Sequence, residues 1–223
     1  MKIRPLICHV ILCLYILPAH PQSNRPSSTE TIPTGAIRIP VPEIQQPENY
    51  SCGAAALMSI LAYYGLPPED YGVLKRELGT NKKNGTDYRR MVSYAAAQRL
   101  HAEALAPMTL EALDACLDGG RPVICSIQAY AEKGSPEQRA AVYEQRNDNG
   151  HYVVAIGRDA RNYYFMDPSL TGRRGYLTRE EFLKRWHDNE GTDARPKIIH
   201  RLGLVIWKDN PSSAYESSAR RIE

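Results

Sequence analysis

The change from helical to strand periodicity near Arg121 is the feature that most strongly restricts the fold of this chain. Before it, apolar side chains recur at helical spacing between glycine breaks, and Thr109 is a suitable N-cap. Helices are expected over residues 53–64, 69–78, 87–99 and 110–118. After it, short apolar runs predict strands over residues 122–127, 151–157, 163–167 and 198–207. Helices followed by a mostly antiparallel sheet indicate an α+β fold.

Three further segments complete this outline. Residues 37–41 are expected to form a short edge strand, which Pro40 and Pro42 limit. Thr178 is expected to cap a helix that extends to Trp186, with Glu181 as its capping-box partner. The polar stretch 128–150 is expected to be a loop, or a loop that holds one short helix.

Both ends of the chain differ in composition from the middle. Lys2 and Arg4 precede an apolar run that is shorter than the roughly 20 residues needed to cross a bilayer. This is typical of a secretory signal over residues 1–19, although an uncleaved anchor is the alternative. We therefore expect an exported protein, periplasmic or extracellular. Its organisation would be a disordered linker over 20–40, one domain over 41–208 and a polar tail over 209–223.

The charge balance argues against several classes of partner. The formal net charge is +3, and two of the positive charges, Lys2 and Arg4, belong to the expected signal. No basic stripe remains for nucleic acid or an anionic membrane. No Cys/His pair has zinc-ligand spacing, so we expect neither a metal nor a cofactor.

The cysteine count indicates a free thiol. Three cysteines follow the expected signal: Cys52, Cys116 and Cys125. Because three is odd, at least one stays unpaired in an oxidising compartment. Cys116 lies in a predicted helix and Cys125 in a predicted strand, where they would form either two buried thiols or a disulfide.

Cys52 stands where a polar, turn-prone segment meets a run of strong helix formers. A thiol at a helix start faces unpaired backbone N–H groups and the positive end of the helix dipole, and both favour the nucleophilic thiolate. The alternative is a structural thiol buried in the core.

A predicted hairpin brings a possible base and its acid together. If its turn centres on Ala160, Ile156 pairs with Tyr163 and His151 falls one residue from Asp167; a shift of one residue makes them directly opposed. Opposed Cβ atoms lie about 4.5–5.5 Å apart. An imidazole held by a carboxylate is a general base with a fixed tautomer. The alternative is an exposed strand-end histidine and an aspartate in a turn.

Four separated motifs then carry a resemblance. They are Gln46-x5-Cys52-Gly-x-Ala, Gly150-His151-Tyr-Val-Val, Asp167-Pro168 with Gly172, and Leu177-Thr-x-x-Glu181-Phe182-x-x-x-Trp186. In this order they resemble the C39 cysteine peptidases, the bacteriocin-processing, double-glycine leader peptidases with a papain-like fold. The resemblance implies Cys52 as nucleophile, His151 as general base and Asp167 as the residue that orients it. It also implies that Gln46 and the Cys52 N–H form the oxyanion hole.

The expected function is hydrolysis of a peptide bond in a peptide or protein substrate, with leader processing as one form of it. Many members of the resembled family are domains of ABC exporters, whereas this sequence carries no Walker motif, so any exporter would be a separate partner. A papain-fold transpeptidase or cell-wall amidase and a non-cleaving peptide-binding module are the alternatives. We expect residues 128–150, just before His151, to select what enters the site.

Overall fold

The structure is a computed structural model that describes residues 36–66, 70–130, 136–170, 174–190, 197–209 and 219–221. The expected signal and residues 20–35 of the expected linker lie outside this part of the chain. None of the described helices is long and apolar enough to cross a membrane.

The helices follow the sequence pattern closely. They are α1 (Cys52–Tyr63), α2 (Tyr71–Glu77), α3 (Tyr88–Ala97), α4 (Leu110–Asp118), α5 (Pro136–Tyr143) and α6 (Arg179–Arg185). The predicted N-caps Thr109 and Thr178 are confirmed, since each side chain accepts a hydrogen bond from a first-turn N–H. Asp70 caps α2 in the same way, so this helix begins two residues later than predicted. The polar stretch 128–150 does hold one short helix, α5.

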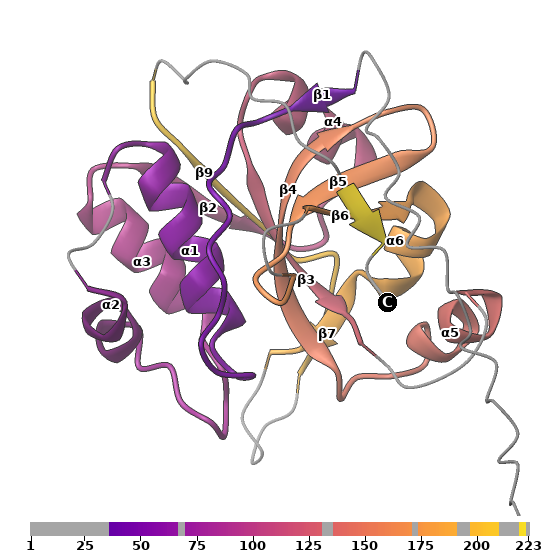
Figure 1. Ribbon diagram of the computed structural model, residues 1–223, viewed down its shortest axis with the longest axis horizontal. Coiled ribbons are helices and arrows are strands. Elements are labelled where there is room, and N and C mark those ends of the chain that lie inside the picture. Colours follow the sequence, from indigo (N-terminus) through magenta and orange to yellow (C-terminus); the bar gives the residue numbers. More distant parts are fainter. Residues whose placement is uncertain are drawn as a thin grey trace, which may run out of the picture.

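One sheet dominates the rest of the molecule (Figure 1). Its strands are β1 (Ile37–Arg38), β2 (His101–Leu105), β3 (Val123–Gln128), β4 (Gly150–Arg158), β5 (Asn162–Met166), β6 (Arg174–Thr178), β9 (Gly203–Trp207) and β10 (Ala219–Arg221). The order is β10-β6-β5-β4-β3-β9-β2, with β1 paired to β4, and every pair except β10–β6 is antiparallel. Strands β7 (His187–Asn189) and β8 (Ile198–His200) form a separate hairpin. The predicted antiparallel α+β architecture is confirmed.

Some strands were not predicted. Strand β2 is an exposed edge strand whose His-Ala-Glu-Ala-Leu sequence holds no Val, Ile, Thr, Tyr, Phe or Trp, the residues enriched in strands. Strand β10 lies within residues 209–223, which were expected to be only a polar tail, and pairs in parallel with β6. Both edge strands therefore form because they pair with a neighbouring strand, and their own sequences do not indicate a strand.

The helices divide between the two sides of the sheet (Figure 1). Helices α1, α2 and α3 gather on one side, and α5 and α6 lie at the other end of the molecule. Helix α1 packs against β4, and its apolar residues Leu57, Ile60 and Leu61 are fully buried, as predicted. The N-terminus of α1 therefore faces the strand that begins at Gly150.

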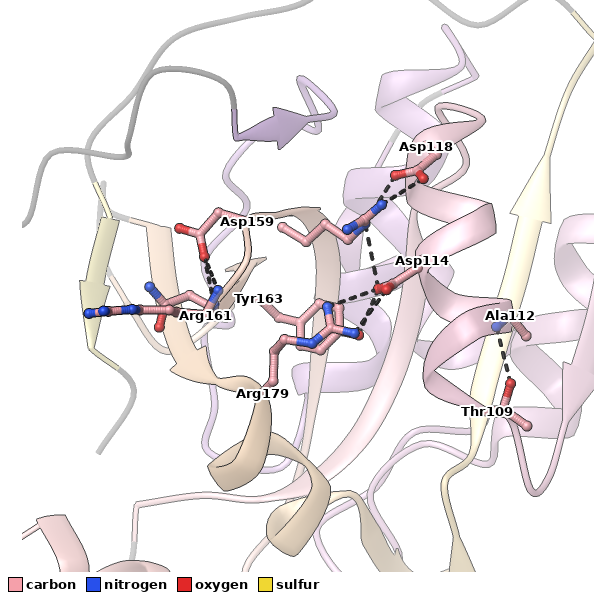
Figure 2. Close-up of polar contacts among 10 residues, drawn as sticks. Thr109, Ala112, Asp114, Asp118, Asp159, Arg161, Tyr163 and Arg179 are labelled. Atoms are coloured by element: carbon pink, nitrogen blue, oxygen red, sulfur yellow. Dashed lines mark hydrogen bonds and ion pairs between the residues drawn. The ribbon is translucent and has the colours of Figure 1, made fainter.

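Helix α4 is fixed to the sheet by a charged cluster far along the chain from Cys52 (Figure 2). Asp114 accepts hydrogen bonds from the Tyr163 hydroxyl at 2.7 Å and from Arg179 Nη2 at 2.9 Å. Arg158 Nη2 donates to Asp118 Oδ2 at 2.7 Å. Burial and then Asp114 raise the pKa of Tyr163, so this hydroxyl remains a donor.

The predicted register of the β4–β5 hairpin is wrong. Ile156 was expected opposite Tyr163, but Arg158 occupies that position. The turn is closed by the Asp159 N–H, which donates to the Asn162 carbonyl at 3.0 Å, so the pairs next to it are already displaced by two residues of β4 from the prediction. The irregularity between Ala155 and Gly157 then reduces this displacement to one residue.

Candidate active site

Cys52 is the first residue of α1 and is buried, with 8% of its surface exposed. Ser51 precedes the helix, but its hydroxyl does not cap it. Instead the hydroxyl donates to Glu48, 3.0 Å from the carbonyl oxygen and 2.9 Å from Oε2. The first-turn N–H groups of α1 therefore lack a side-chain cap from Ser51, and the helix dipole acts beside the thiol.

Gly53 allows this helix start to approach the sheet. A Cβ atom at this position would lie 2.7 Å from Thr86 Cβ and 3.0 Å from Tyr152 Cδ2. Carbon atoms cannot approach so closely without displacement. The glycine next to Cys52 is therefore required to hold α1 against Tyr152 of β4, one residue beyond His151.

His151 and Asp167 meet, as the sequence predicted. His151 Nε2 lies 2.8 Å from Asp167 Oδ1, and both side chains are buried. The contact is diagonal rather than directly opposed: Val154 pairs with Met166, and continuing this register places Asp167 beside Val153, two residues along β4 from His151. Residues two apart on a strand share a face, so the side chains still reach each other.

The charges around His151 favour its protonated form. Burial lowers the pKa of the imidazole, but the negative charge and hydrogen bond of Asp167, followed by a hydrogen bond with Cys52, raise it to about 10. Because Nε2 is held by Asp167, Nδ1 is the ring nitrogen left for the thiol. The imidazole therefore lies under the influence of both Asp167 and Cys52.

Asp167 is held by more groups than the sequence suggested. Its Oδ1 also accepts from the Ser169 N–H at 2.8 Å, and its Oδ2 accepts from the Tyr130 hydroxyl at 2.7 Å. Burial raises the pKa of this carboxyl, but His151, Tyr130 and the Ser169 N–H together lower it below its usual value. No periodic pattern in the sequence indicated Tyr130 or Ser169.

Gln46 lies beside this group. Its backbone N–H donates to the Pro168 carbonyl at 3.0 Å, and its Nε2 donates to the Glu48 carbonyl at 2.9 Å. Its Oε1 accepts from the Ser169 hydroxyl at 3.2 Å, which fixes the orientation of the amide. One N–H of the Gln46 amide is left without a partner among the residues that the structure describes.

The segment between Gln46 and Cys52 is anchored from α2. Lys75 forms an ion pair with Glu48, and the Tyr71 hydroxyl donates to the Ser51 carbonyl at 3.0 Å. Glu48 in turn accepts hydrogen bonds on its carbonyl from both Gln46 and Ser51. The position of the Gln46 amide relative to Cys52 is therefore set by a connected network.

The stretch 128–150 starts and ends beside His151. Ile127 pairs with His151, and Gln128 pairs with Gly150. The Ala129 N–H donates to the Asn149 carbonyl at 3.0 Å, so the two ends of the stretch are held together. The expectation that this stretch selects the substrate stays a prediction.

Two half-buried acids that the sequence did not indicate lie beside Tyr152 of β4. Glu190 accepts from the Tyr152 and Ser126 hydroxyls at 2.7 and 2.6 Å. Burial and then Glu190 raise the pKa of Asp188 to about 7. Gly150 makes room for this group, since a Cβ atom there would lie 1.8 Å from Asp188 Oδ2.

The remaining cysteines are buried free thiols, which settles the alternative that the sequence left open. Burial raises the pKa of both Cys116 and Cys125. In the described ranges, no group of three or more His, Cys, Asp or Glu side chains could hold a metal ion. A metal-free site stays a prediction.

Comparisons with known proteins point to one family. The family model described as "Peptidase_C39 like family" matches residues 38–193. No curated protein sequence matches the chain.

Solved structures show the same fold. A protein described as a C39-like peptidase from Bacillus anthracis is 20% identical, with a TM-score of 0.58 over 80% of this chain and 100% of that chain. A double glycine motif protease from the AMS/PCAT transporter, solved with its leader peptide, is 22% identical, with a TM-score of 0.52 over 76% and 92%. The peptidase domain of Streptococcus ComA, a bi-functional ABC transporter, is 19% identical, with a TM-score of 0.51 over 73% and 95%. The expected papain-like α+β fold is confirmed.

Proposed function

Since the chain belongs to the Peptidase_C39 like family and is a cysteine peptidase, we propose that Cys52 is its nucleophile, His151 its general base and Asp167 the residue that orients His151. The observation that carries this proposal is the buried 2.8 Å contact between His151 and Asp167, together with a helix-start thiol, Cys52, that is near enough to raise the pKa of the imidazole. A nucleophile, a base and an orienting group within hydrogen-bond reach of one another are the arrangement that acyl transfer requires.

The reaction follows from these contacts. His151 accepts the proton of Cys52, and the thiolate attacks the carbonyl carbon of a peptide bond. The oxyanion receives hydrogen bonds from the free Gln46 amide N–H and the Cys52 backbone N–H. His151 then donates its proton to the leaving amine, and a water molecule that His151 activates hydrolyses the thioester to release the acid and restore the thiol.

Once His151 has accepted the proton of Cys52, the pair is a thiolate beside an imidazolium. With its pKa raised to about 10, His151 carries a positive charge at neutral pH. That charge and the start of α1 both stabilise a thiolate on Cys52. The nucleophile is therefore ready before the substrate arrives.

We propose leader-type peptides, cleaved after a double glycine, as the substrates. Membership of the family supports this choice, and so does the structural similarity to the AMS/PCAT double glycine motif protease, which was solved in complex with a leader peptide. The test is to incubate the protein with peptides that contain or lack a Gly-Gly pair and to identify new termini by mass spectrometry, using iodoacetamide-treated protein as control. New termini after Gly-Gly are expected. Thiol-dependent cleavage only at other sequences would contradict the leader proposal, and products joined to an added amine would indicate transfer.

We also propose that the protein is exported. Lys2 and Arg4, followed by the apolar run from Leu6 to Leu17, support this. When the full chain is expressed in a bacterial host, the exported fraction is expected to have the mass of the chain without residues 1–19. Ala19→Arg should block the cleavage, because signal peptidases require a small residue there. Full-length protein that stays in the cytoplasm would contradict the proposal.

A further inference from the structure

Tyr130 contacts both members of the proposed base–acid pair. Its hydroxyl donates to Asp167 Oδ2 at 2.7 Å. Its ring meets the His151 ring edge to face, with the centroids 5.5 Å apart and the planes at 72°. The one side chain therefore binds the acid and covers the base.

The backbone of Tyr130 supports a specific requirement for its position. Its φ angle is +61°, a left-handed conformation that is uncommon for a bulky residue. Strain of this kind persists where the surroundings impose it, and it gathers at functional sites. Tyr130 lies two residues after the end of β3. The residue before it, Ala129, exchanges hydrogen bonds with Asn149, which fixes the backbone at this point.

The groups around the Tyr130 hydroxyl keep it protonated. Although 36% of the Tyr130 surface is exposed, its hydroxyl faces the buried Asp167; desolvation of the hydroxyl first, and then the charge and hydrogen bond of Asp167, raise its pKa, and Tyr143 from α5 acts in the same direction. Arg185 from α6 acts in the opposite direction but is itself ion-paired with Glu181. The hydroxyl is thus a permanent hydrogen-bond donor, and it is not the proton carrier.

The two oxygens of Asp167 are held differently. Oδ1 is shared by His151 Nε2 and the Ser169 N–H, whereas Oδ2 is bound among the described residues by Tyr130 alone. A buried carboxylate oxygen that loses its donor bears a full desolvation penalty. Without the hydroxyl, the carboxyl group is free to turn and is protonated more easily.

We propose that Tyr130 is a positioning residue that fixes the carboxylate of Asp167 against His151 and shields the pair from water. This inference rests on the proposed function of the triad. If Tyr130 has this role, the thiolate–imidazolium pair should exist over a wider range of pH than it would without the hydroxyl, because a charged and aligned Asp167 stabilises the imidazolium. When the hydroxyl is removed, the acid limit of this range should move to higher pH.

The experiment measures the rate of Cys52 alkylation by iodoacetamide from about pH 4 to about pH 10, which follows the thiolate without needing a substrate. Mass spectrometry of the Cys52 peptide excludes signals from Cys116 and Cys125. The variants are Tyr130→Phe, which keeps the ring, and Tyr130→Leu, which loses ring and hydroxyl. Tyr163→Phe is the matched control, because that hydroxyl also donates to a carboxylate at 2.7 Å, but in the Asp114 cluster (Figure 2).

For Tyr130→Phe we expect the midpoint of the acid limb to move to higher pH by about one unit. Below this midpoint the alkylation rate should therefore be about tenfold lower than in the parent protein. Tyr130→Leu should shift the acid limb further in the same direction, and Tyr163→Phe should leave it unchanged. Thermal unfolding of each variant checks that the protein is folded. Equal profiles for the parent and both folded Tyr130 variants, or an acid limb that moves to lower pH in them, would overturn the role of Tyr130. A parent protein whose Cys52 reacts like a free thiol would instead refute the proposed triad.

Discussion

Cys52→Ala is expected to lower kcat for peptide hydrolysis by about 10⁴-fold or more, and His151→Ala to lower it by a similar factor. The two side chains act as a unit, because the thiol attacks only after the imidazole has taken its proton. The double variant should therefore lose no more activity than either single variant. Initial rates on a peptide cleaved by the parent protein measure all three.

Cys116→Ala is the matched control for these variants. Cys116 is a free thiol as buried as Cys52, but it lies on α4, away from His151. We expect it to keep full activity, with a thermal unfolding midpoint close to that of Cys52→Ala, since each change removes one sulfur atom. Full activity in Cys52→Ala, or activity lost equally in Cys116→Ala, would exclude Cys52 as the nucleophile.

The elements that bear the proposed nucleophile and base were predictable because local patterns set them. A polar turn followed by strong helix formers placed Cys52 at the start of α1, and Thr109 and Thr178 marked the starts of α4 and α6. The contact of His151 with Asp167 was found despite a wrong register. The turn at Asp159–Asn162 displaces the pairing, and the irregularity near Ala155 has no local signal, but residues two apart share a face, so His151 still reaches Asp167.

The groups that support the site were not predictable, because they arrive from distant segments without periodicity. Tyr130 follows the end of β3, and the Asp188–Glu190 pair comes from the β7 hairpin. Their sequence neighbours carry no motif that would distinguish them from loop residues. Only the tertiary arrangement brings their polar atoms to Asp167 and Tyr152, so sequence reasoning could name the three proposed catalytic side chains but not what holds them.

Gln46 and its neighbour Gln45 differ in their surroundings, and this difference supports the proposed role of Gln46. The sequence alone could not choose between adjacent glutamines, and only the family spacing favoured Gln46. In the structure Gln45 is exposed, whereas Gln46 is partly buried and its amide is oriented by Glu48 and Ser169. An amide whose oxygen and one N–H are already bound presents its other N–H in a fixed direction, which is what stabilisation of an oxyanion needs.

Gln46→Ala is therefore expected to lower kcat by about 10²- to 10³-fold, with a much smaller change in KM, because the lost donor acts mainly on charge that develops during the reaction. Gln45→Ala, the same change one residue earlier, should leave both constants near those of the parent protein. Iodoacetamide alkylation of Cys52 should stay unchanged in Gln46→Ala, since this reaction develops no oxyanion. A loss confined to KM, or an equal loss in Gln45→Ala, would remove Gln46 from the oxyanion hole.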